Sequence, residues 1–197
     1  ILFIFILSEF KKLRIITLIL SVIIISLISI SNDEIRERNI DHTINQMYQD
    51  GELKLFSPQH QSHYLGAYKM FTDNPLFGIG PKLFRDFCSY EKYNIDKYTC
   101  STHPHNTYFQ ALAETGIIGL AFILIPLVLI LHQLFKKFKD TIRGHKSNIT
   151  DYQACLLICF LVSLWPFIPT QALFNNWISV IYFLPVGFYL QTVYGKE

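Results

Sequence analysis

Apolar residues form five segments along the chain, and polar residues fill the stretches between them. The second segment, Ile15 to Ile30, has sixteen apolar or hydroxyl residues without a charge. As a helix it would extend about 24 Å, close to the thickness of a bilayer core. The other segments are Ile1 to Leu7, Ile117 to Phe135, Ala154 to Ile168 and Trp177 to Val193. This pattern predicts an all-α polytopic membrane protein.

The stretch from 31 to about 112 is polar and mixes acidic with basic residues. Two short loops, 8–14 and 136–146, are rich in lysine and arginine. Short basic loops of this kind stay in the cytoplasm, so the long stretch between them is expected on the opposite side. The alternative is that the basic loops bind anionic lipid without setting the topology.

Composition agrees with a membrane protein. Of the 197 residues, 51% are hydrophobic and only 16% are charged, whereas soluble domains carry about a quarter charged residues. A net charge of +2 with no basic-aromatic array gives no basis for nucleic-acid binding. The chain opens at Ile1 inside an apolar run, so we expect it to be the C-terminal portion of a longer protein.

A polar loop meets an apolar segment between residues 101 and 120. Pro104 suits the first position of a helix, with a cap one or two residues earlier and His105 in the first turn. The positive end of that helix would favour a neutral imidazole that can act as a base. Gly116 is expected to stop or bend the helix. The alternative is a histidine that only bonds to nearby backbone.

A second polar segment contains two glycines and two cations. Gly78 and Gly80 predict a tight turn that leads into a helix at Lys82, whose amides could face an anion. Lys82 and Arg85 would then share one helix face, and a guanidinium can hold a phosphate through two hydrogen bonds. The alternative is an ordinary surface helix with solvated cations.

The spacing in these two segments is informative. His105 and Asn106 are followed by nine residues and then by G-I-I-G, an H-N-x9-G-x-x-G pattern. The upstream segment 74–85, N-P-L-F-G-I-G-P-K-L-F-R, fits P-x-x-G-x-G-x-x-x-F. Together, over roughly residues 60 to 120, the chain resembles the bacterial O-antigen ligase and polymerase superfamily.

This resemblance implies a GT-C-like glycosyltransferase whose periplasmic loop contains short helices. Such enzymes move a glycan from a polyprenyl diphosphate to a hydroxyl acceptor without a metal or other cofactor. The acceptor is lipid A-core in ligases, a glycan repeat in polymerases, and a protein in O-oligosaccharyltransferases. We expect ligation to lipid A-core, with the other two acceptors as alternatives.

The resemblance also implies roles for residues. His105 would position or deprotonate the acceptor hydroxyl, Arg85 would hold the diphosphate, and Asn106 and Glu114 would orient other groups. Many relatives carry an arginine about fifteen residues before the P-x-x-G-x-G segment. Here His60 or His63 lies near that place, and Arg36 or Arg38 could supply the missing charge, so the full set of diphosphate contacts stays open.

In domain terms we expect a multi-pass protein of the bacterial inner membrane. Residues 1–30 would form membrane helices around a cytoplasmic loop at 8–14, and 31–115 a periplasmic catalytic loop. Residues 116–197 would form three membrane helices with a basic cytoplasmic loop at 136–152.

The chain has four cysteines. Cys88 and Cys100 lie in the expected external loop, where an oxidising compartment would allow a disulfide, although two buried thiols are the alternative. Cys155 and Cys159 fall in an apolar segment and are expected to pack there.

Two other interpretations are a zinc site and a non-catalytic transport protein. His60, His63, His103 and His105 could supply four imidazoles to zinc, but their spacing matches no known zinc motif, so no metal is expected. A non-catalytic transporter or flippase subunit is the other. Transporters place charges inside the membrane, whereas these apolar segments are almost free of them (His132 is the exception).

Overall fold

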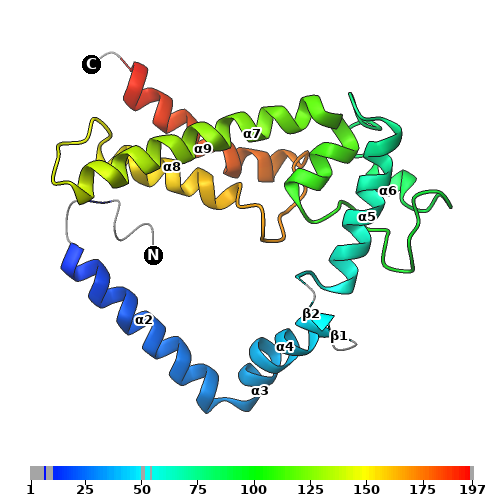
Figure 1. The fold of residues 1–197 in the computed structure, drawn as a ribbon, viewed down its shortest axis with the longest axis horizontal. Coiled ribbons are helices and arrows are strands. Elements are labelled where there is room, and N and C mark those ends of the chain that lie inside the picture. The colour runs from blue at the N-terminus through cyan, green and yellow to red at the C-terminus, as the bar shows by residue number, and fades with distance from the viewer. Residues whose placement is uncertain (1–6, 8–10, 50–51, 54, 196–197) are drawn as a thin grey trace.

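The computed structural model describes residues 7, 11–49, 52–53 and 55–195, so the expected segment 1–7 lies outside it except for Leu7 (Figure 1). The first elements are α2 (Lys11–Ser31), α3 (Asp33–Arg36), the π-helix η1 (Glu37–Asp41), α4 (His42–Met47), β1 (Tyr48–Gln49), β2 (Glu52–Leu53) and α5 (Pro58–Asp73). They are followed by α6 (Phe84–Phe87), α7 (Thr107–Ile142), α8 (Asp151–Ser163) and α9 (Asn176–Tyr194). Apart from one antiparallel pair of two-residue strands, the described elements are helical.

Three of these helices, α2, α7 and α9, are long and apolar enough to cross a membrane. The described chain therefore confirms the prediction of an all-α polytopic membrane protein. α2 is apolar around its whole circumference and lies apart from α7, α8 and α9 (Figure 1). Such a helix needs lipid or further protein around it, since water would leave its apolar side chains unburied.

α7 is the element to which most others attach. It packs against α8, which in turn packs against α9, and the core between them includes Ile130, Leu134, Leu157 and Phe160. At the far end of α7, the buried Lys137 Nζ lies 2.8 Å from Asp151 Oδ1 and 2.8 Å from the Ile149 carbonyl. This ion pair fixes the loop between α7 and α8.

The first turns of α7 belong to a second core. α5 and α6 lie beside them (Figure 1), and Met70, Phe84 and Ala113 are fully buried there. This core packs α5 and α6 against the first turns of α7, next to the loop that carries His105.

Candidate active site

Four histidines meet where α5 packs against the loop before α7. The His105 ring centroid lies 4.2 Å from that of His103, 5.3 Å from His63 and 5.8 Å from His60. His60 and His63 come from the first turns of α5, about forty residues earlier in the chain. Helix packing therefore gathers imidazoles that the sequence keeps in two separate places.

His105 does not lie in the first turn of a helix, so that prediction is wrong. α7 begins at Thr107, and Asn106 is its cap, with Oδ1 accepting hydrogen bonds from the amides of Tyr108 and Phe109. Asparagine is among the best capping residues, and it outcompetes the Pro104 start. His105 instead has a left-handed backbone with φ of 57°, a conformation that surrounding contacts must maintain.

Those contacts come from the turn between α8 and α9, residues 164–175, which the sequence did not connect to the site. The Thr170 amide donates to the His105 carbonyl at 2.9 Å, and the Thr170 carbonyl accepts from His103 Nε2 at 3.1 Å. Asn106 Nδ2 donates to the Pro166 carbonyl at 2.9 Å. This turn therefore holds the histidine loop from the side opposite α5.

Hydrogen bonds also select ring tautomers. His103 Nε2 and His63 Nδ1 face the carbonyls of Thr170 and Thr99, so both nitrogens must carry a proton. His105 Nε2 lies 2.9 Å from Ser101 Oγ. When this nitrogen donates to Ser101, His105 Nδ1 is the basic nitrogen, and it has no partner among the described residues.

The cluster favours neutral imidazoles. Burial, with the neighbouring His103, His63 and His60, lowers the pKa of His105 to about 4. Burial also lowers the pKa of His60, with a smaller contribution from His63. The pKa of His103 is lowered by burial, against the opposing Thr170 hydrogen bond, and further by His63 and Arg85. At neutral pH His105 can therefore accept a proton.

The Gly78–Gly80 turn fits directly against the bend of α7. The helix breaks at Gly116, whose φ is 66°. The amides of Ile79 and Gly80 donate to the carbonyls of Ala113 and Glu114 at 2.9 and 3.0 Å. In return the Ile117 amide, freed by the bend, donates to the Pro75 carbonyl at 2.9 Å. The two motif segments are thus joined backbone to backbone.

This pairing corrects two expectations about the turn. The amides of Gly78 and Gly80 are bonded to carbonyls inside the protein, so they do not face an anion. Lys82 lies before α6 with a left-handed φ of 65°, so it does not share a helix face with Arg85. α6 has four residues, Phe84–Phe87, too short for the expected amphipathic face.

Glu114 is fully buried and serves the backbone of this turn. Its carboxylate accepts from the Lys82 amide at 2.9 Å and the Phe84 amide at 3.1 Å. Gln110 Nε2 donates to the same carboxylate at 3.0 Å. Glu114 therefore positions the backbone of the residues before Arg85.

The positive charge of Arg85 acts on the histidine cluster. Its charge lowers the pKa of His103 but is not among the causes that act on His105 or His60. The Arg85 side chain is exposed, so it can meet an anionic partner.

A disulfide joins Cys88, directly after α6, to Cys100, directly before Ser101. The loop that it closes rests on α5, where Ser62 Oγ donates to Asp96 Oδ2 at 2.6 Å and the Thr99 carbonyl accepts from His63. The crosslink therefore connects the segment of Arg85 to the segment of His105.

Replacing both Cys88 and Cys100 by serine is expected to lower the free energy of unfolding by about 3 kcal/mol, because a short loop loses its constraint. Thermal unfolding of the purified protein in detergent measures the loss. The matched control is Cys159→Ser, which removes an exposed free thiol and should change little. Maleimide labelling of Cys88 and Cys100 in untreated protein would contradict the crosslink.

The histidines do not form a metal site in the described geometry. Among the described residues, no group of three or more His, Cys, Asp or Glu side chains is placed to hold a metal ion. Both ring nitrogens of His103 are bonded, to Thr102 Oγ1 and to the Thr170 carbonyl. In this geometry His103 therefore has no free ring nitrogen to offer to a metal ion.

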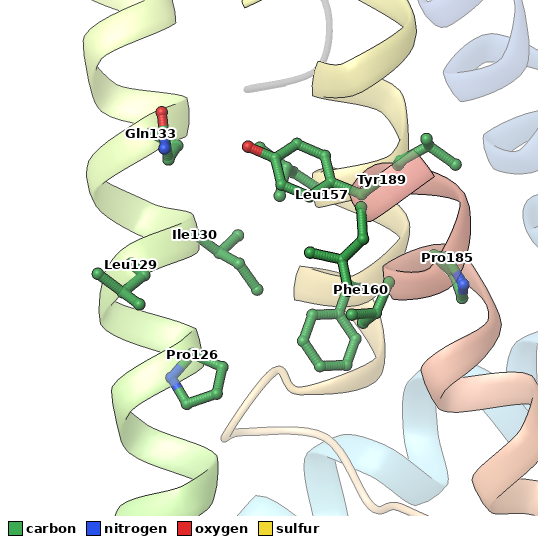
Figure 2. A pocket seen from close by; sticks show the side chains of 11 residues that line it. Pro126, Leu129, Ile130, Gln133, Leu157, Phe160, Pro185 and Tyr189 are labelled. Carbon is green, nitrogen blue, oxygen red and sulfur yellow. The ribbon is translucent and has the colours of Figure 1, made fainter. Parts of the chain in front are cut away.

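A separate apolar groove of about 350 Å³ lies between α7, α8 and α9. Figure 2 shows Pro126 and Ile130 of α7 facing Phe160 of α8 across it. Gln133 and Tyr189 supply its polar atoms. The groove contains none of the four clustered histidines, so it is separate from the histidine cluster.

Comparison with known proteins identifies a family for this chain. A family model described as O-antigen ligase matches residues 1–124. No curated protein and no solved structure matches the chain. The match covers more than half of the chain and includes both segments that meet at the bend of α7, so it confirms the family that the motifs indicated. The chain therefore belongs to the O-antigen ligase family of membrane enzymes.

Proposed function

We propose that this protein is an inner-membrane glycosyltransferase that moves a glycan from a polyprenyl diphosphate to a hydroxyl of lipid A-core. The proposal rests on the environment of His105. Its backbone is held by Thr170, one ring nitrogen is open, and its pKa is lowered to about 4. A neutral histidine in such a place is suited to take a proton from a hydroxyl.

In the proposed reaction, His105 Nδ1 accepts the proton of the acceptor hydroxyl while that oxygen bonds to the anomeric carbon of the donor glycan. The bond between this carbon and the diphosphate oxygen breaks, and the diphosphate leaves with the electron pair. Arg85 is the candidate partner for the charge that develops there, because a guanidinium can pair with two phosphate oxygens. No metal or other cofactor takes part.

Two further residues receive roles in this proposal. Asn106 caps α7 and bonds to Pro166, so it would orient His105 and not react. Burial lowers the pKa of His60, which would therefore contact substrate as a neutral hydrogen-bonding group. It would not supply the positive charge of the arginine that relatives carry near this place.

The proposed topology follows from the charges. The basic loops at 8–14 and 136–152 would lie in the cytoplasm, and the loop 31–115 in the periplasm. α7 would then enter the membrane after its bend at Gly116. The histidine cluster would lie at the outer leaflet, where both lipid-linked substrates are available.

The test uses the full-length protein in a bacterial strain that lacks its own O-antigen ligase. Lipopolysaccharide gels are expected to show a ladder. Arg85→Ala is expected to reduce transfer about 10²-fold, because one contact to the leaving group is lost. Lys69→Ala removes another exposed cation, on α5, and should leave the ladder unchanged.

The same strain separates the acceptors. Longer lipid-linked glycans without a ladder would indicate a polymerase, and a glycosylated protein would indicate an O-oligosaccharyltransferase. If the well-expressed protein gives none of the three products, the proposed glycosyltransferase activity is overturned.

A further inference from the structure

A pocket of about 260 Å³ lies beside the histidine cluster. α4, the first turns of α5 and the 164–175 turn each contribute to its lining. His60 belongs to both places: it lines the pocket, and its ring centroid lies 5.8 Å from that of His105. One ring of the pocket lining is therefore a neighbour of the candidate base.

The lining mixes aromatic rings with hydrogen-bonding groups. Phe56, Tyr64 and Phe167 supply rings, and Gln46 and His60 supply polar atoms. A pyranose ring has the matching chemistry, because its C–H faces pack on aromatic rings while its hydroxyls need donors and acceptors. A lipid chain could not form hydrogen bonds with the polar groups. A diphosphate would need a Lys or Arg, and the lining contains neither.

The aromatic part of the pocket is held rigidly. Tyr64 stacks on Phe109 with ring centroids 4.5 Å apart and an interplanar angle of 3°, and Phe56 meets Tyr64 edge-on at 5.0 Å. Phe167 differs because it is 71% exposed, and its ring lies 6.3 Å from that of Trp165. An exposed ring at the rim of a pocket can cover a sugar without first losing other contacts.

The position of the pocket selects one of the two substrates. Arg85 is not among the residues that line the pocket, whereas His60 is. His105 has both imidazoles as neighbours, at 4.2 and 5.8 Å. A sugar in the pocket would thus lie beside the base and away from the candidate diphosphate partner. This is the arrangement that an acceptor requires.

We propose that this pocket binds the acceptor sugar ring, with Phe167 stacking on the ring and Gln46 and His60 bonding to its hydroxyls. The inference rests on the proposed function, since it assumes that His105 deprotonates the acceptor. It names Phe167 and Gln46 as residues that determine acceptor affinity.

The test measures transfer kinetics of the full-length protein with purified lipid-linked donor and lipid A-core acceptor. Phe167→Ala and Phe167→Leu are each expected to raise the acceptor KM about tenfold, because the stacking face is lost. The donor KM and kcat should stay within about twofold of wild type, since the pocket is separate from Arg85. Phe167→Tyr keeps the ring and should behave as wild type.

One control and one further pocket variant separate this effect from a general loss of apolar surface. Phe122→Ala removes a ring that is 77% exposed on α7, far along the chain from the pocket, and should leave all constants unchanged. Gln46→Ala should raise the acceptor KM without affecting the donor. An unchanged acceptor KM in both Phe167→Ala and Gln46→Ala would overturn the subsite, as would a rise in the donor KM alone.

A binding measurement makes the subsite independent of turnover. Deacylated core oligosaccharide, which has no lipid chains, is titrated into the wild type and Phe167→Ala while binding is followed by calorimetry. Saturable binding that weakens about tenfold in Phe167→Ala supports the subsite, whether or not transfer occurs. If this binding is observed but the wild type transfers no glycan, only the proposed function is overturned. Transfer by the wild type without any such binding difference overturns the subsite alone.

Discussion

His105→Ala is expected to reduce glycan transfer by about 10³-fold while the protein still reaches the membrane, because a general base contributes a factor of this order. The side chain is held by Ser101, and the His105 carbonyl by Thr170, so truncation removes the imidazole but keeps the backbone bond. Donor-to-acceptor transfer in membranes, normalised to a blot of protein level, measures the loss. His132→Ala, an exposed histidine farther along α7, is the matched control and should retain activity.

The pH profile gives a second reading of the same residue. The base must be neutral, and the pKa of His105 is lowered to about 4 by burial and by the neighbouring imidazoles. Activity should therefore stay level as the pH falls from 7 to 5 and should decline only near pH 4. A histidine with an ordinary pKa would lose activity already below about pH 6.5. Wild-type activity in His105→Ala, or a decline centred near 6.5, would contradict the assignment.

Gly116→Ala is expected to lower the free energy of unfolding by about 3–5 kcal/mol. The residue has a φ of 66°, and an added Cβ would lie 2.4 Å from the carbonyl carbon and oxygen of Leu76. That neighbour is backbone from the other motif segment, so it cannot rotate away. The variant should lose the pairing of the two segments, and its thermal unfolding midpoint in detergent should fall sharply.

Gly144→Ala is the control for this prediction. Gly144 also has a left-handed backbone, with φ of 69°, but an added Cβ would meet nothing within 4 Å. It should therefore lose only about 1 kcal/mol, from backbone strain alone. Equal unfolding midpoints for the two variants would show that the close approach of Gly116 to Leu76 contributes nothing.

Local sequence decides the helices of this protein. Long apolar runs without charges form helices here, because the backbone must satisfy its own hydrogen bonds in lipid. The runs at 15–30, 117–135 and 177–193 lie in helices long enough to cross a membrane, whereas the run at 154–168 lies partly in α8, which has 13 residues and ends at Ser163. The bend at Gly116 was also predictable, because a glycine at the junction of polar and apolar residues readily leaves the helical conformation. The motif around His105 also pointed to the family that the match over residues 1–124 confirms.

The start of α7 shows where local rules fail. Proline at a first helical position and asparagine at a cap are both favourable, and the two rules place the helix start at different residues. The bond from Asn106 Nδ2 to the Pro166 carbonyl, sixty residues away, favours the asparagine cap. The same choice leaves His105 outside the helix.

The site itself was decided by tertiary packing. Thr170 carries no local signal of its role, and the sequence alone does not show that His63 packs beside His105. In the structure, His63 lies 5.3 Å from the His105 ring, and Thr170 bonds to the His105 backbone. Such contacts depend on which distant segments pack together, and the hydrophobic pattern of the sequence does not predict this packing. The sequence determined the membrane helices, the bend and the family, because these follow from local hydropathy and spacing. Only the folded chain determined the neutral histidine cluster, because burial and proximity lower a pKa and both arise from packing.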